Sequence, residues 1–364
     1  MHIGGVYQLL NDIPGRADTY KRCMLEFFLG PFLLAFGITT AILLLFFSAV
    51  RWSRWLRDHE KLWFRFGGVA IFAGFLISLS LDGRLLMSTP LWGFVFGSVI
   101  LFGFSIWDDL FNLSWRAQIF FQVVLGLLLF LFEVRILFVT NPFGGVWSFA
   151  PELSLLPVFA IGLGWLMLVM NALNWLDGSD GLCGGVSFIA LITIFFLTLK
   201  PEVYQPAFAI IAAGGAGAVL GFLLFNLPPA RIFAGTSGSM FLGFLLVFLS
   251  TAAGTKIATA LLVLMLPIAD AFLVIAERFM SGTSIFERDQ RHLHHKLSSL
   301  GWSRGRITVI LLLFTAIIAY LALQTRAEGK LLILILSFVL VIIFSLLVAK
   351  RARKHRQSLT RRTL

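Results

Sequence analysis

Long apolar runs recur along the chain and are separated by short polar segments. A membrane-spanning helix needs about 20 consecutive apolar residues, and about eleven runs approach that length. These runs lie near residues 27–50, 67–80, 91–107, 117–138, 154–171, 183–199, 206–225, 238–253, 257–277, 307–325 and 331–349. The pattern predicts an all-α, polytopic integral membrane protein with about 11 transmembrane helices.

The composition agrees with this pattern. Of the 364 residues, 59% are hydrophobic and only 13% are charged, and this excludes a soluble globular class. The net charge of +11 comes from Lys and Arg residues that gather in every second loop. By the positive-inside rule those loops face the cytoplasm, so we expect the N-terminus outside and the C-terminus inside. The cytoplasmic segments are then 51–66, 108–116, 171–182, 226–237, 278–306 and 350–364.

Three parts of the chain are expected. Residues 1–26 form an extracytoplasmic N-terminal segment, residues 27–349 form the transmembrane domain, and residues 350–364 form a basic cytoplasmic tail. A basic tail beside a membrane helix is typically a topology anchor attracted to anionic lipid, so we expect no nucleic-acid partner. The predicted outer loops are short and lack polar clusters, whereas the cytoplasmic loops carry them. We therefore expect the function on the cytoplasmic side.

The polar stretch from Asn171 to Gly185 lies between two apolar runs and holds two carboxylates, two carboxamides and four glycines. Carboxylates at membrane depth usually mark a functional site. Asp177 and Asp180 are three residues apart, which places them on one face if the segment is helical. Asn174 stands one turn earlier, at the same spacing from Asn171. The alternative is a Gly-rich connecting loop with side chain–backbone turns.

Asp108 and Asp109 form a second acidic pair at the end of the third apolar run. Adjacent carboxylates repel each other, and a divalent cation or a shifted pKa would relieve that repulsion. The alternative is a solvated helix end that helps to fix the topology. The pair alone is weak evidence for a site.

A third polar segment runs from Asn226 to Ser239 and leads into the eighth apolar run. Its Gly/Ser/Thr turn, which begins at Gly235, stands where a helix starts. A helix N-terminus presents free N–H groups and the positive end of the helix dipole, which suits a diphosphate. Small residues are also ordinary at helix starts, so the pattern is not specific.

The longest predicted cytoplasmic loop begins at Arg278 and contains three histidines, His292, His294 and His295. Imidazole and guanidinium groups can together bind phosphate oxygens. Zinc ligation is less favoured because no cysteine lies nearby, and a solvated loop is the remaining alternative. His59, in another cytoplasmic loop, is a lone histidine that by default lies on the surface.

Asp270 lies inside the ninth apolar run, after Pro267. A carboxylate at this depth suggests either a substrate or proton contact from a broken helix, or a polar pairing inside the bundle. The sequence leaves these two alternatives open.

Taken in order, these motifs resemble those of the polyprenyl-phosphate N-acetylhexosamine-1-phosphate transferases of the WecA/MraY superfamily, of glycosyltransferase 4 type. The most specific match is Asn171-x-x-Asn174-x-x-Asp177-Gly-x-Asp180-Gly-Leu. Four further segments are similar to family motifs, although Asp58 replaces the usual lysine of the first: Arg57–Gly68, Asp108–Gln122, Asn226–Ser239 and the HxHH run Asp289–Leu297. The histidine run is typical of the WecA-like branch, which uses UDP-N-acetylhexosamines such as UDP-GlcNAc.

The resemblance implies Mg²⁺-dependent transfer of a sugar 1-phosphate from a UDP-N-acetylhexosamine to undecaprenyl phosphate, with release of UMP, at the bacterial inner membrane. Mn²⁺ is the alternative metal, and a homodimer is a further option. Asp108 would be the base, and Asp109 would orient the site or share the metal. Asp177 and Asp180 would position metal and nucleotide. The substrate-binding residues would be His59, Asn171, Asn174, Asn226, Arg278, His292, His294 and His295.

One residue departs from the family pattern. Thr236 stands where family members carry an aspartate that binds magnesium, and a hydroxyl is a far weaker ligand for Mg²⁺ than a carboxylate. Asp109 and Asp177 would then be the main metal ligands, with Thr236 a doubtful third. This departure motivates an alternative, namely a catalytically impaired relative that acts as a lipid-binding or assembly partner. A transporter is less favoured, because its charges should lie in mid-span rather than at helix ends.

Overall fold

The computed structural model describes residues 16–54, 58, 64–141, 143–149, 155–252, 257–284 and 291–360. His59, predicted to bind substrate, lies outside these residues, as does most of the loop that contains it. The described elements are α2 (Arg16–Trp52), α5 (Gly67–Ser80), α6 (Thr89–Phe111), α7 (Trp115–Leu131), β1 (Phe138–Thr140), β2 (Val146–Ser148), α8 (Leu155–Leu176), α9 (Leu182–Thr198), α10 (Pro206–Asn226), α11 (Gly235–Ala252), α12 (Ile257–Val263), α13 (Met265–Met280), α14 (Leu293–Ser299), α15 (Arg304–Gln324) and α16 (Ala327–Thr360).

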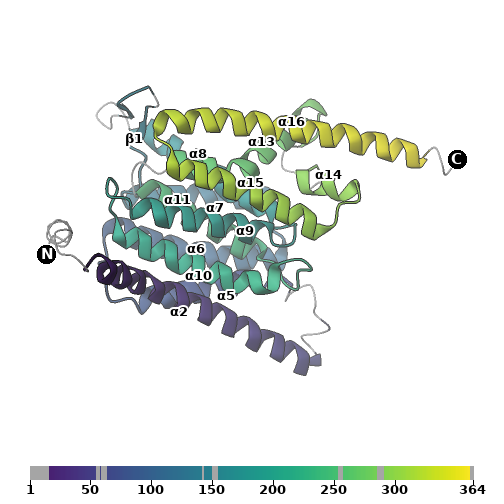
Figure 1. Cartoon of the computed structure of the whole chain (residues 1–364). Helices are drawn as coiled ribbons and strands as arrows, with labels where there is room; N and C mark the ends of the chain where they lie inside the picture. Colours follow the sequence, from purple (N-terminus) through teal and green to yellow (C-terminus); the bar gives the residue numbers. More distant parts are fainter. Residues whose placement is uncertain are drawn as a thin grey trace.

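The helices form one bundle whose long members lie side by side, with α2 beginning at one end and α16 ending at the other (Figure 1). Among the described residues, seven helices are long and apolar enough to cross a membrane, and the bent pair α12–α13 makes an eighth candidate. The shorter apolar helices α5, α7 and α9 coincide with three more of the predicted spans. The chain is thus an all-α polytopic membrane protein; the exact number of spans and their orientation stay predictions.

Two predicted spans differ from the structure. The run near 117–138 does not form one helix: α7 ends at Leu131, and Phe138 begins a two-stranded antiparallel hairpin with β2. Gly144 and Gly145, both with positive φ, lie in the turn between the two strands of this hairpin. The run near 257–277 is divided into α12 and α13, which are bent by 72°.

Two helices lie at the centre of the bundle. In the most apolar window of α11, 94% of the residues are buried, and in that of α10, 83%, against 22% for both α2 and α16. Small residues on α10 permit close helix packing: a Cβ added to Gly217 would lie 2.0 Å from the carbonyl oxygen of Phe32 on α2. The outer faces of the peripheral helices carry many exposed Leu, Ile and Phe side chains, as expected for contact with lipid.

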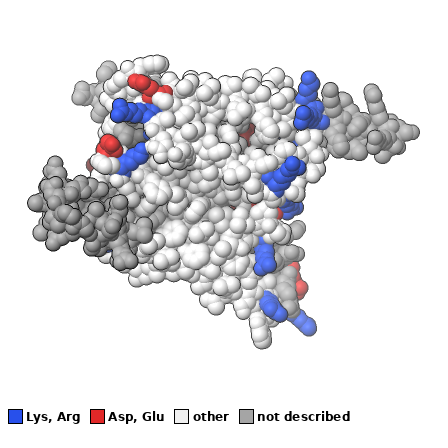
Figure 2. Space-filling model, viewed as in Figure 1, with Lys and Arg blue, Asp and Glu red and all other residues white. Residues whose placement is uncertain are grey.

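The charged side chains are also unevenly distributed over the bundle. Lys and Arg gather at the two ends of the bundle in the view of Figure 2, with an uncharged band between them. An uncharged band between charged ends is the expected surface of a membrane-embedded bundle.

Candidate active site

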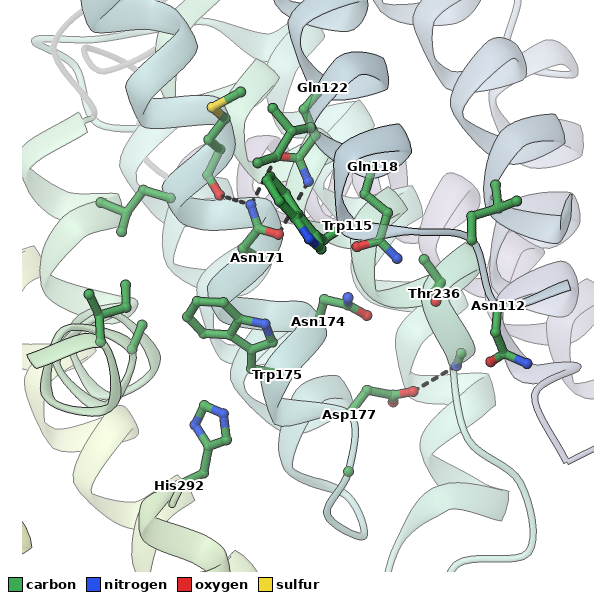
Figure 3. A pocket seen from close by; sticks show the side chains of 18 of the residues that line it. Asn112, Trp115, Gln118, Gln122, Asn171, Asn174, Trp175, Asp177, Thr236 and His292 are labelled. Carbon is green, nitrogen blue, oxygen red and sulfur yellow. Dashed lines mark hydrogen bonds between the residues drawn. The ribbon is translucent and has the colours of Figure 1, made fainter. Parts of the chain in front are cut away.

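A cavity of about 950 Å³ lies among α7, α8, α13, α14 and the start of α11. Seven of the residues predicted from the sequence line it: Asn171, Asn174, Asp177, Thr236, Arg278, His292 and His295. They come from three separate polar segments, so the fold brings distant motifs to one site (Figure 3). Five other predicted residues do not line the cavity in the described structure, namely Asp108, Asp109, Asp180, Asn226 and His294.

Two carboxylates meet at the N-terminus of α11. Asp177 accepts hydrogen bonds from the backbone N–H groups of Ala234, at 3.2 Å, and Gly235, at 2.7 Å. Asp109 accepts from the N–H groups of Thr236 and Ser237, at 2.8 and 2.9 Å. The first turn of a helix has unpaired N–H groups that anions stabilise. The prediction that this turn offers free N–H groups to a diphosphate is therefore wrong: the two aspartates occupy them.

The environment of Asp177 changes its acidity. Burial raises the pKa of its carboxyl to about 8, because a low-dielectric surrounding disfavours the charged form, and the neighbouring charge of Asp109 raises it further. The two backbone N–H donors and the Arg65 guanidinium act in the opposite direction. Arg65 lies 3.6 Å from the Asp109 carboxylate. Two acidic groups thus share one small region with a single nearby guanidinium among the described residues.

This donor set fits a magnesium ion. Mg²⁺ in phosphate-transferring sites is commonly held by one or two carboxylates, with waters and substrate phosphates completing its shell. Asp109 and Asp177 supply two carboxylates that repel each other. Asp177 accepts the N–H of Gly235 and Asp109 that of the next residue, Thr236, which also lines the cavity. Within the described residues no three His, Cys, Asp or Glu side chains form a cluster that could hold a metal ion, so a magnesium ion here would depend on the two carboxylates with waters and substrate phosphates.

Glycines hold the start of α11 in place. A Cβ on Gly68, in the first turn of α5, would lie 2.2 Å from the backbone nitrogen of Gly238 and 2.5 Å from the carbonyl oxygen of Ala234. A Cβ on Gly67 would lie 2.5 Å from the carbonyl oxygen of Phe233. These backbones approach so closely that only glycine fits. The Gly-Gly pair at 67–68 therefore positions the helix terminus that both aspartates contact.

Asp108 is fully buried, although its neighbour Asp109 reaches the helix terminus. Its Oδ1 accepts hydrogen bonds from the Leu113 N–H, at 2.9 Å, and the Gln118 side chain, at 3.0 Å. Its Oδ2 is buried and has no partner within the described structure. These contacts join the end of α6 to the start of α7. They make Asp108 a residue that positions Gln118, which lines the cavity, rather than one that faces it.

Asp180 points away from the cavity. The helical spacing that predicts a common face with Asp177 fails, because α8 ends at Leu176 and the following residues form turns. The carboxylate of Asp180 instead accepts from the Ala230 N–H at 3.1 Å and pairs with Arg304 at 3.2 Å. Asn226 acts similarly, accepting from the Gly181 N–H at 3.0 Å and donating to the Ile232 carbonyl at 2.7 Å. Both side chains join the 177–181 turn to the 226–235 loop.

The other two carboxamides lie on the wall of the cavity formed by α8. Asn171 and Gln122 exchange two hydrogen bonds between their side-chain amides, at 2.9 and 3.2 Å. Asn174 accepts from the Ser239 hydroxyl at 2.8 Å, and it lies between Trp175 and Thr236 in Figure 3. The Asn174 carbonyl is thereby occupied, so its amide N–H₂ group is the part that can serve a ligand.

The three histidines of the α14 motif have different surroundings. His292 and His295 line the cavity, whereas His294 is buried, and its Nε2 has no partner among the described residues. Burial lowers the pKa of His294 to about 3, and repulsion from a protonated His295 contributes. His294 is therefore neutral at physiological pH. It cannot act as a cationic phosphate ligand, as the sequence motif alone would allow.

Several lining residues were not singled out as site residues from the sequence: Arg65, Asn112, Trp115, Gln118, Gln122 and Trp175. A signal existed for Asn112, because asparagine directly after a helix often adopts the left-handed conformation that ends it, and Asn112 has φ 49°. Trp115 and Trp175 have no such signal, since tryptophan near a membrane boundary is ordinarily an interfacial anchor.

Several known proteins are similar to this chain. Residues 91–254 match the model of the family described as Glycosyl transferase family 4. A decaprenyl-phosphate N-acetylglucosaminephosphotransferase of Mycobacterium leprae is 30% identical, over 79% of this chain and 82% of that protein. A probable undecaprenyl-phosphate N-acetylglucosaminyl 1-phosphate transferase of Bacillus subtilis is 28% identical, over 79% and 80%. An undecaprenyl-phosphate α-N-acetylglucosaminyl 1-phosphate transferase of Escherichia coli is 27% identical, over 72% of each.

The chain is thus a membrane-embedded transferase, and it belongs to glycosyl transferase family 4. The relatives named above are WecA-like polyprenyl-phosphate N-acetylglucosamine-1-phosphate transferases, as the sequence motifs predict.

Proposed function

We propose that this protein transfers N-acetylglucosamine 1-phosphate from UDP-N-acetylglucosamine to undecaprenyl phosphate and releases UMP. The names of its relatives support the acceptor class and the transferred group. The observation that carries the proposal is the cavity itself: the Asp177 carboxylate lines it beside the α11 terminus that Asp109 also contacts, and cationic and imidazole side chains line it elsewhere. The reaction initiates the synthesis of a cell-envelope polysaccharide at the cytoplasmic face of the bacterial inner membrane.

The reaction requires two anionic phosphoryl groups to meet. An oxygen of the lipid phosphate attacks the β-phosphorus of the UDP-sugar, the bond from that phosphorus to the bridging oxygen breaks, and UMP leaves. Repulsion between the reactants is the main obstacle, so catalysis rests on positioning and charge neutralisation. Arg65, Arg278, His292 and His295 line the cavity and supply donors for phosphate oxygens.

Asp109 and Asp177 would hold the magnesium ion. When bound, Mg²⁺ neutralises phosphate charge and orients the diphosphate for in-line attack. The chain's own contribution is to hold both carboxylates against the first turn of α11, four backbone hydrogen bonds fixing their orientation. Asp108 and Asp180 support this site from outside by holding the loops around it.

The cavity also has an apolar side that suits a lipid acceptor. Ile119 of α7, Met167 and Leu168 of α8, and Phe272 and Ile275 of α13 line it. An isoprenoid chain would bury apolar surface against these side chains while its phosphate reaches the polar side.

The direct test is an assay of the purified protein in detergent. Incubation with undecaprenyl phosphate, UDP-N-acetylglucosamine labelled in the sugar, and Mg²⁺ should yield one labelled lipid and an equal amount of UMP. A parallel panel of other UDP-N-acetylhexosamines identifies the preferred sugar. Absence of product with every donor, over a wide range of Mg²⁺ and Mn²⁺ concentrations, would contradict the proposal. It would favour the catalytically impaired lipid-binding or assembly partner that Thr236 suggests.

A further inference from the structure

Asp270 has no role in the chemistry described above, yet it is a carboxylate buried inside the bundle, 4% exposed. It lies on α13, one turn beyond the 72° bend between α12 and α13. A buried carboxylate is strongly disfavoured unless hydrogen bonds or a positive charge compensate it. The partners of Asp270 therefore indicate why the chain keeps it there.

Both oxygens of Asp270 bind the start of α14. Oδ2 lies 2.8 Å from Nδ1 of His292, and Oδ1 accepts the backbone N–H of Leu293 at 2.9 Å. Because a carboxylate only accepts, Nδ1 of His292 must carry the proton of this hydrogen bond. The arrangement resolves the two alternatives that the sequence left open: Asp270 pairs inside the bundle rather than contacting the cavity.

His292 is thereby held between Asp270 and the cavity. Its ring lines the cavity and lies 5.7 Å from the ring of Trp175, centre to centre, and Figure 3 shows the two side chains together. Nε2 has no hydrogen-bond partner among the described residues. With Nδ1 protonated and bound to a carboxylate, Nε2 is the nitrogen that can gain or lose a proton in response to a ligand.

We propose that Asp270 is a positioning residue that makes His292 a proton-coupled ligand for the diphosphate group of the donor. When the diphosphate enters the cavity, His292 takes up a proton at Nε2 and donates that N–H to a phosphate oxygen. The Asp270 carboxylate balances the new charge from the other side of the ring. This inference rests on the proposed function, because it assigns a nucleotide diphosphate to the same cavity.

Other titratable and charged groups face this pair. Arg278, on α13, lines the cavity and keeps its charge throughout. On α14, His294 stacks on His292, with ring centres 5.8 Å apart, but burial keeps it neutral. His295 lines the cavity and can also titrate. Asp177, at the end of α8, can itself bind a proton beside an anion, but Asp270→Asn leaves Asp177 and His295 unchanged.

The test is calorimetry of UDP binding to the full-length protein in detergent, without added metal ions, in buffers of different ionisation enthalpy near pH 7.5. The buffer dependence gives the number of protons taken up. In Asp270→Asn, the amide can accept from Leu293 and donate to Nδ1, but the charge that stabilises the imidazolium is lost. We expect uptake to fall by about half a proton, and UDP affinity to fall about tenfold.

The matched control is Glu277→Gln. Glu277 of α13 pairs with Lys296 of α14 at 2.7 Å, so this variant also breaks a carboxylate contact between the same two helices, yet neither residue lines the cavity. It should keep the proton uptake and UDP affinity of the unmodified protein. Equal loss of uptake in both variants would overturn the inference, because the effect would then report only the docking of α14.

A second variant keeps the inference testable if Asp270→Asn does not fold. His292→Gln retains a side-chain N–H donor but does not titrate, so it should bind UDP with reduced proton uptake. Unchanged uptake in His292→Gln or Asp270→Asn, with UDP still binding, overturns the inference and leaves the proposed function intact. A protein that does not bind UDP at all, with or without Mg²⁺, contradicts the proposed function itself.

Discussion

Asp177 and Asp180 stand three residues apart in one Asp-Gly-Ser-Asp-Gly segment, yet they belong to different parts of the molecule. Asp177 lines the cavity and contacts the N-terminus of α11, whereas Asp180 turns toward Ala230 and the exposed Arg304. The two side chains diverge because α8 ends at Leu176, just before the segment. One motif therefore contains a residue that lines the cavity and a residue that joins two parts of the fold.

The largest expected effect is the loss of turnover when Asp177, the aspartate that lines the cavity, is replaced. Asp177→Asn keeps the shape of the side chain but removes its charge, so we expect turnover to fall at least about a hundredfold, the usual loss when one electrostatic group is removed from such a site. The measurement is formation of labelled lipid by detergent-purified protein of matched thermal stability. Turnover within a few fold of the unmodified protein would remove Asp177 from the chemistry.

The acidity of Asp177 gives the next prediction. Its pKa is raised to about 8, so below that pH the metal-free carboxyl holds a proton that a metal ion must displace. The Mg²⁺ concentration for half-maximal activity should therefore rise as the pH falls, about tenfold per pH unit for one displaced proton, and should level off above pH 8. A requirement that stays flat between pH 6.5 and 8.5 would contradict this account.

A substitution at Thr236 tests whether this residue belongs to the proposed metal site. Thr236→Asp adds a third carboxylate beside Asp109 and Asp177, and hard Mg²⁺ prefers carboxylate to hydroxyl oxygen. The half-maximal Mg²⁺ concentration should fall about tenfold, which is about 1.4 kcal/mol. Thr236→Asn, of similar size but uncharged, is the control and should change it little. An unchanged requirement in Thr236→Asp would place Thr236 outside the metal site.

Replacement of Asp180, which joins two parts of the fold, should have a smaller effect on turnover and a measurable effect on stability. Asp180→Ala leaves the partly buried N–H of Ala230 without its side-chain acceptor, which costs at most about 1–3 kcal/mol and should lower the thermal unfolding temperature. Arg304→Gln is the control: its side chain is 73% exposed, and an exposed ion pair contributes at most about 1 kcal/mol. If Asp180→Ala abolished turnover without a change in stability, Asp180 would belong with Asp177.

The three histidines, like Asp177 and Asp180, are neighbours in one motif but have different surroundings in the structure. In sequence, His292, His294 and His295 are equivalent candidates for phosphate binding. In the structure, α14 begins at Leu293, so that His292 and His295 line the cavity while His294 turns into the protein interior. Asp270, distant in the sequence and left there with two alternatives, hydrogen-bonds to His292.

The sequence alone determined the class of fold and the segments that form the candidate site. Apolar runs of membrane-spanning length specify helices because no other open backbone satisfies its hydrogen bonds in lipid. Polar residues retained beside such runs identify the functional segments, because carboxylates there are costly. Seven of the predicted residues accordingly line one cavity.

The tertiary structure decided which residue of each motif faces that cavity. The direction of a side chain depends on where its helix ends and on what packs against it. The spacing of residues in the sequence gives neither the helix end nor the packing partners. Asp109 and Asp177 come together because both accept hydrogen bonds from the first turn of α11, which glycine backbones hold close to α5. Asp108 instead accepts from the Leu113 N–H, and Asp180 from the Ala230 N–H. The tertiary fold thus separates the residues at the candidate site from the residues that support it, since only packing fixes their orientation.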